Sequence, residues 1–219
     1  SKFQTRYINY SDRSFKKKFE CLINDERKSN NNVSITVSKI LKEILVNGDD
    51  GLNNYVSKFD KINVKQIKEL LITKDILKKA YDGLKKEQKK ALNVAAERIK
   101  QFHKQQIPKN FSYKDNLKVN LGLSHSPIES AGFYVPGGKA AYPSSVLMNA
   151  IPAMIAGVKR RVMVVPARDG NVNSLVLAAA ALAGVTEVWR IGGAQAVAAL
   201  AYGTQMIAPV DKIVGPGNA

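Results

Sequence analysis

The chain has 219 residues, of which 45% are hydrophobic and 24% charged, a composition typical of a globular protein with a packed core. Its single cysteine, Cys21, excludes an internal disulfide and a cysteine-rich zinc cluster. No apolar run reaches the roughly 18 residues of a membrane span and the first residues lack the apolar stretch of a secretory signal, so we expect a cytoplasmic protein with no membrane partner. The net charge is +16, with 27 Lys and Arg against 14 Asp and Glu in residues 1–120 but 7 against 4 in residues 121–219, a spread that argues against one compact nucleic-acid-binding patch.

The amino-terminal part of the chain is expected to be mainly helical. Residues 1–30 are polar and basic with little periodicity, which is typical of an arm that packs on another surface or of a frayed end. Apolar residues recur at helical spacing over residues 37–45, and Gly48 is expected to end that helix. A longer helix is predicted from about residue 85 to residue 106, because an apolar stripe there is followed by a proline.

The carboxyl-terminal part is expected to alternate strands with helices. It holds 12 of the 15 glycines. An alternating stretch at residues 117–121 and a compact apolar run at residues 132–135 predict strands. Beyond them we expect strands at residues 161–165, 187–191 and 212–214, and helices at residues 144–154, 173–182 and 194–202. Apolar strands that alternate with helices predict parallel βαβ units with right-handed crossovers.

These patterns predict an α/β protein in which a Rossmann-like parallel βαβ sheet is preceded by a mainly helical region. We divide the chain into a basic amino-terminal arm at residues 1–30 and a mainly helical first part of domain 1 at residues 31–130. A Rossmann-like nucleotide-binding domain is expected to follow at residues 131–219.

Three glycine-bearing loops follow predicted strands, at residues 134–139, 191–195 and 214–218. Ligands of open parallel sheets bind outside the carboxyl ends of the strands, where glycines let backbone amides approach a diphosphate at a helix N-terminus. A tight strand-to-helix turn is the alternative explanation for any one such loop. Because each of the three loops carries a polar side chain, we expect these side chains to converge on a nucleotide: Tyr134, Gln195 and Asn218. We also expect Gln195 to be replaceable by alanine without emptying a core.

No residue can be assigned to catalysis from spacing alone. The sequence has neither a G-x-G-x-x-G fingerprint nor a phosphate-binding G-x-x-x-x-G-K-[ST] loop. His103 on the long predicted helix and His125 in a loop belong to no metal-ligand cluster, and no Ser/His/Asp arrangement is apparent. The residues by themselves therefore predict a nucleotide-binding module with a helical partner region and without a visible catalytic or metal-binding group.

The glycine loops lie within longer sequence segments whose residues and order are specific. The segments are GFYVPGG at residues 132–138, AYPSSVLMNAIPA at 141–153, GGAQA at 192–196, AALAYGT at 198–204 and VDKIVGPGNA at 210–219. In the residues and spacing of these segments the chain closely resembles the histidinol dehydrogenase family. The resemblance is strong over about residues 130–219 and weaker, but consistent, over the long predicted helix.

The resemblance implies an NAD-dependent oxidoreductase acting on CH–OH groups. Such an enzyme oxidises L-histidinol through L-histidinaldehyde to L-histidine, with two NAD consumed in the last steps of histidine biosynthesis. Tyr134, Gln195 and Asn218 match the family positions that contact NAD, so residues 131–219 would be an NAD-binding domain that is incomplete at its carboxyl-terminal end. The family is a zinc-requiring homodimer whose active site borrows residues from the partner chain.

The resemblance also implies what this chain lacks. The family's zinc ligands (a Gln, two His and an Asp), its Glu–His acid/base pair and its substrate-binding Ser lie beyond Ala219. The chain is therefore expected to be an amino-terminal half with no catalytic or metal-binding residue, inactive by itself. Lys139 stands where the family more often has a small hydroxyl residue.

Two other classes of protein remain as alternatives. A basic nucleic-acid-binding protein would explain the net charge, but it predicts clustered Lys and Arg with interleaved aromatic residues. A bias toward Lys and Asn on solvated helix faces is the favoured explanation of the charge, and we expect no specific nucleic-acid partner. A different NAD-dependent dehydrogenase, such as a relative of the aldehyde dehydrogenases, would need a nucleophilic cysteine, and Cys21 lies in the basic arm, far from the glycine loops.

Overall fold

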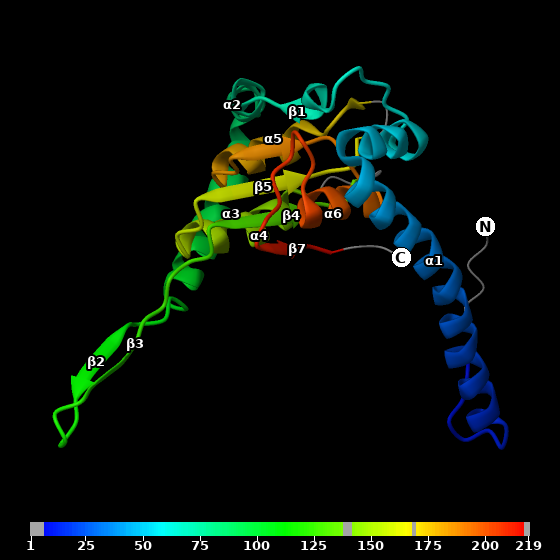
Figure 1. The fold of residues 1–219 in the computed structure, drawn as a ribbon, viewed down its shortest axis with the longest axis horizontal. Coiled ribbons are helices and arrows are strands. Elements are labelled where there is room, and N and C mark those ends of the chain that lie inside the picture. Colours follow the sequence, from blue (N-terminus) through cyan, green and yellow to red (C-terminus); the bar gives the residue numbers. More distant parts are fainter. Residues whose placement is uncertain (1–6, 138–141, 168–169, 217–219) are drawn as a thin grey trace. The chain divides into compact units, whose positions relative to one another are not determined.

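The computed structural model describes residues 7–137, 142–167 and 170–216, with the backbone alone for residues 24–32 (Figure 1). It divides into two compact units, one reaching to Lys39 and the other beginning at Ile40. Helix α1 spans Phe15–Tyr55. The segment expected to be an arm or a frayed end is thus helical from Phe15 onward. Its Lys, Arg and Glu residues favour a helix, but without an apolar stripe they leave no periodic signal in the sequence.

A kink at Gly48 divides α1. The backbone there has φ 54° and ψ −125°, outside the helical region, so the helix predicted to end at this glycine is followed at once by a second helical segment. That segment runs on to Tyr55, and a π-helical turn, η1, follows at Val56–Asp60. Ile40 and Ile44 of the predicted apolar stripe are buried, whereas Leu45 is exposed.

The central sheet has five strands in the order β1-β6-β5-β4-β7. Strands β4 to β7 are mutually parallel, and β1 pairs antiparallel with β6. The predicted α/β fold with a parallel βαβ sheet is confirmed. Strands β4, β5 and β6 lie side by side in chain order, and β7 then pairs with the opposite edge of β4. The strand bounds are Leu71–Ile72 for β1, Ser130–Tyr134 for β4, Arg160–Val164 for β5, Glu187–Trp189 for β6 and Lys212–Val214 for β7.

Helices cover both faces of this sheet (Figure 1). One face is covered by α2, α3, α4 and α5, which share a core with Met163 and Val188. The other face packs against α6, α1 on both sides of its kink and a 3-10 turn, η2, through a core that includes Val162, Val164 and Trp189. Alternate residues of β5 thus face opposite layers. The bounds are Ile67–Leu70 for η2, Lys74–Asp82 for α2, Lys86–Lys104 for α3, Pro143–Ile155 for α4, Ser174–Leu182 for α5 and Gly193–Tyr202 for α6.

A second, two-stranded sheet pairs β2, Phe111–Lys114, with β3, Asn120–Leu123. The strand predicted over residues 117–121 is misplaced, because the first three of those residues belong to the turn. Asp115 Oδ1 accepts hydrogen bonds from the backbone amides of Leu117 and Val119 at 2.9 and 2.8 Å. That side chain stabilises a turn where the alternating pattern favours an extended strand.

None of the helices in the described ranges is long and apolar enough to cross a membrane.

Candidate functional site

The carboxyl ends of β4, β5, β6 and β7 lie at one edge of the sheet, since the four strands are parallel. The loops that leave β4, β6 and β7 are the three glycine-bearing loops singled out in the sequence. The order in which strands are added reverses at β4: β5 and β6 lie on one side of it and β7 on the other, although α4, α5 and α6 separate β4 from β7 along the chain. Such a reversal opens a crevice that binds ligands in doubly wound sheets.

The hydroxyl of Tyr134, at the end of β4, accepts a hydrogen bond of 3.1 Å from the backbone amide of Gly193. Gly193 is the first residue of α6 and has φ +63°, a conformation that favours glycine. A Cβ placed on it would stand 2.6 Å from Gln195 Oε1, so a larger residue would also collide with that amide. The loop after β6 is thereby held against the end of β4, and two of the predicted side chains, Tyr134 and Gln195, lie at the same turn.

The loop after β7 runs against the same strand end. Gly215 has φ +141°, and a Cβ on it would overlap the backbone oxygen of Tyr134. Only glycine allows that approach. The third predicted residue, Asn218, lies outside the described residues, as does Lys139.

Gln195 is buried, with only 1% of its surface exposed. Its Nε2 donates a 3.0 Å hydrogen bond to Oδ2 of Asp60, and the backbone amide of Gly192 donates to Oδ1 of the same carboxylate at 3.1 Å. The expectation that Gln195 could be replaced without emptying a core is wrong. Asp60 is the last residue of η1, so these hydrogen bonds join η1 to the start of α6.

Sequence reasoning missed Asp60. This carboxyl group is 6% exposed, and burial raises its pKa above the ordinary value, although the hydrogen bonds from Gln195 and Gly192 act in the opposite direction. Asp60 precedes Gln195 by 135 positions in the chain, and no glycine motif or helical periodicity marks it. Only the packing of η1 over α6 brings the two residues together.

A pocket of about 370 Å³ opens beside this turn. Its walls come from α1, from η1, from the loop after β5 and from the start of α6: Ile40, Phe59, Asp60, Pro166, Gly192, Gly193, Ala194 and Gln195. This volume falls within the range of small-molecule sites. The first backbone amides of a helix have no partner within the helix, so they are available to a ligand or to a capping group.

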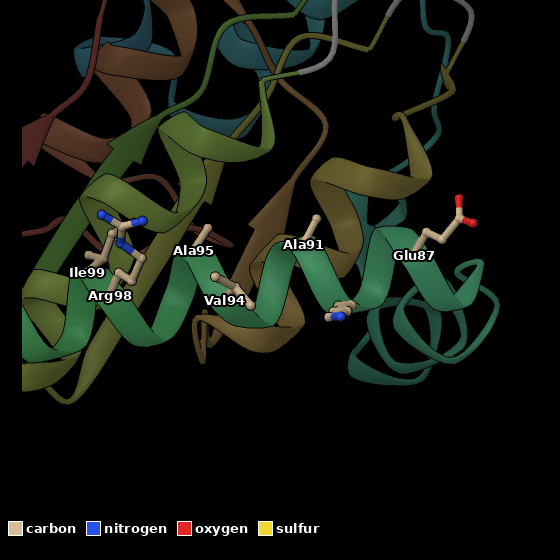
Figure 2. Close-up of a pocket in the computed structure, with 7 residues that line it drawn as sticks. Glu87, Ala91, Val94, Ala95, Arg98 and Ile99 are labelled. Carbon is tan, nitrogen blue, oxygen red and sulfur yellow. The ribbon is translucent and has the colours of Figure 1, made fainter.

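A larger hollow, of about 680 Å³, lies along α3 (Figure 2). Ala91, Val94, Ala95 and Ile99 form its apolar floor, with Glu87 and Arg98 at its margins. All of its lining residues belong to one helix. The smaller pocket at α6 is the better candidate site, because side chains and backbone amides from four separate segments meet there.

The two histidines, His103 and His125, line a further pocket of about 290 Å³. His103 Nδ1 lies 2.6 Å from Gln106 Oε1, and the backbone amide of His125 donates to Asn110 Oδ1 at 2.7 Å. Across residues 7–137, 142–167 and 170–216, no group of three or more His, Cys, Asp or Glu residues is arranged to hold a metal ion.

Comparison with known proteins identifies the family to which this arrangement belongs. The family model described as histidinol dehydrogenase matches residues 23–219. The chain belongs to the histidinol dehydrogenase family. The resemblance at the glycine loops is thereby confirmed. The match also extends back over the helical region, where the resemblance found in the sequence is weaker.

Curated histidinol dehydrogenases match nearly the whole chain. The enzyme of Rhodospirillum rubrum is 51% identical over 212 residues, and that of Agrobacterium fabrum is 48% identical over 213 residues. Each alignment covers 97% of this chain and 49% of the relative. The chain therefore spans about half the length of the curated relatives it matches.

The fold comparison agrees. The crystal structure of histidinol dehydrogenase from Elizabethkingia anophelis superposes with a TM-score of 0.78 at 35% sequence identity, over 85% of this chain and 42% of that one.

Proposed function

We propose that the protein carrying this chain is a histidinol dehydrogenase that oxidises L-histidinol through L-histidinaldehyde to L-histidine, with two NAD, in histidine biosynthesis. Membership of the family supports this activity. The observation that carries the proposal for this chain itself is the meeting of the β4 end and the α6 start, where the Tyr134 hydroxyl bonds to the Gly193 amide. This contact lies beside the reversal of strand order at which dinucleotides bind in such sheets.

In this proposal the chain supplies the surface that binds NAD, and NAD supplies the hydride acceptor for each oxidation. The Tyr134 hydroxyl oxygen accepts a hydrogen bond from the Gly193 amide, and its own O–H is left to donate a hydrogen bond to an oxygen of the dinucleotide. Gln195 and the amides of the first turn of α6 border the pocket from the other side. Asn218, in the loop that follows β7, is proposed as the third contact.

The finer properties of the family are proposed for the whole protein. They are a zinc requirement, a homodimer and a cytoplasmic location. The described residues of this chain offer no group of three His, Cys, Asp or Glu side chains arranged for zinc, so the part proposed for them is to bind and orient the dinucleotide. The zinc ligands and the acid/base pair are expected in the part of the family's length that this chain does not span.

Tyr134→Phe in the full-length protein tests the proposed site. The substitution keeps the aromatic ring and removes the hydroxyl that bonds to Gly193 and would bond to NAD. We expect NAD to bind about fivefold to thirtyfold more weakly, which corresponds to a lost hydrogen bond of about 1–2 kcal/mol. Isothermal titration with NAD measures the change.

Tyr113→Phe is the matched control, because Tyr113 is 56% exposed on β2. It should leave NAD affinity at the wild-type value. Equal NAD affinities for Tyr134→Phe and the wild type would refute the site.

A further inference from the structure

The hydrogen bonds of Asp60 determine how the Gln195 amide is oriented. An ionised carboxylate only accepts hydrogen bonds. Gln195 must therefore turn its Nε2 toward Asp60 Oδ2, at 3.0 Å, and its Oε1 away from it. Oε1 lies next to Gly193, where an added Cβ would stand 2.6 Å from it. Gly193 and Gln195 both border the pocket at α6.

Asp60 also occupies the helix terminus itself. Its Oδ1 accepts a hydrogen bond from the Gly192 amide at 3.1 Å, and the Tyr134 hydroxyl oxygen accepts one from the Gly193 amide at 3.1 Å. The Asp60 carboxylate, bonded to the amide of the N-cap residue Gly192, lies beside the positive end of the α6 dipole, which would attract a phosphate in a vacant site. A phosphate placed here would find these two amides engaged and a like charge beside them.

We infer that Asp60 is a positioning residue of the dinucleotide site, which fixes Gln195 as a hydrogen-bond acceptor toward the pocket and selects a ligand group that donates. This inference rests on the proposed NAD site. The group that fits is a neutral donor of the dinucleotide, an O–H of ribose or an N–H of the carboxamide. The Asp60 carboxylate disfavours a diphosphate beside the amides of Gly192 and Gly193.

Asp60→Asn in the full-length protein separates this role from a structural one. An asparagine has the same shape, and its Oδ1 can still accept from Gly192. Its Nδ2 faces Gln195 as a donor, so the Gln195 amide turns over and presents Nε2 to the pocket. Both internal hydrogen bonds survive, but the acceptor is lost. We expect the KM for NAD to rise about tenfold while kcat and the melting temperature change little.

The double variant Asp60→Asn/Gln195→Glu restores the acceptor. One oxygen of the new glutamate accepts from Asn Nδ2, and the other faces the pocket. We expect its KM for NAD to return to within about threefold of the wild-type value. Asp82→Asn is the control for loss of a carboxylate, because Asp82 is exposed at the end of α2, and its KM should be unchanged.

Two results would overturn the inference. One is a wild-type KM for NAD in Asp60→Asn. The other is a fall in melting temperature that accompanies the rise in KM and persists in the double variant, which would show a structural role alone. The proposed site is tested separately, because Tyr134→Phe weakens NAD binding whether or not Asp60 orients Gln195.

Discussion

Asp60 is a carboxyl group that folding moves from water into a buried turn, and burial raises its pKa above the ordinary value of 3.8. The folded protein therefore binds this proton more tightly than the unfolded chain does, and protonation favours the folded state. The stability that Asp60 contributes in this way is present below pH 3.8 and is lost as the pH rises through the raised pKa.

The pKa of Asp211 is shifted in the opposite direction to that of Asp60. The amide and hydroxyl of Ser130 donate to Asp211 Oδ2 at 2.8 and 3.0 Å, which lowers the pKa of that carboxyl. Its contribution to stability is present above the ordinary pKa and is lost as the pH falls through the lowered one. The two effects partly cancel in the wild type, so a variant is needed to isolate the Asp60 part.

We define a difference as the unfolding free energy of Asp60→Asn minus that of the wild type. We expect this difference to increase as the pH rises from below 3.8 through the raised pKa of Asp60, and to stay constant above that pKa. The variant has no proton to lose at this position. Urea unfolding followed by the fluorescence of Trp189, the single tryptophan and 3% exposed, measures the difference. Parallel pH curves for the two proteins would contradict the assignment.

At the scale of the elements, Gly48 determines how the second segment of α1 starts. Its conformation, φ 54° and ψ −125°, is one that side chains rarely adopt. A Cβ there would also overlap Gln205, whose Oε1 accepts from the Asp49 amide at 2.7 Å. The kink and the loop after α6 are thus tied together.

Gly48→Ala is expected to lower the unfolding free energy by roughly 1–3 kcal/mol, the cost of one strained backbone position. Combining it with Gln205→Ala should recover the steric part of the loss and leave the conformational part. Urea titrations of the two variants measure both parts. A Gly48→Ala protein as stable as the wild type would show that the kink is not required.

The elements that sequence reasoning found are those with local signals. Strands β4 to β7 and helices α4 to α6 consist of apolar runs closed by glycine, and the structure confirms them within a few residues. Strand β1, at Leu71–Ile72, gave no such signal, because it is too short for a period and pairs with distant β6. Sequence reasoning also missed α2, although its apolar residues recur at helical spacing and Gly83 follows it. The Tyr134–Gly193 meeting followed from topology, whereas the Asp60–Gln195 pair depends on tertiary packing that no local pattern records.

For the whole molecule, the net charge of +16 predicts an attraction for polyanions of any sequence. The excess of Lys and Arg is dispersed through residues 1–120 rather than gathered with aromatic residues, and the parallel sheet is nearly balanced in charge. We expect weak binding to DNA that depends steeply on salt and not on sequence. Fluorescence anisotropy of two unrelated duplexes across a salt series measures it. Nanomolar affinity for one defined duplex at physiological salt would require a further function.

The strand order has a consequence for the time course of folding. Strand β4 pairs on one side with β5, a βα unit away, and on the other with β7, which is synthesised after β5 and β6: Ala131 pairs with Lys212. At the opposite edge of the sheet, Leu71 of β1 can pair only after Trp189 of β6 has been synthesised. Contacts so distant along the chain form slowly, because loop closure must precede them. During synthesis the β4–β5–β6 layer can assemble while the outer edge of β4 stays unpaired, and that interval is when the nascent protein is most prone to aggregate.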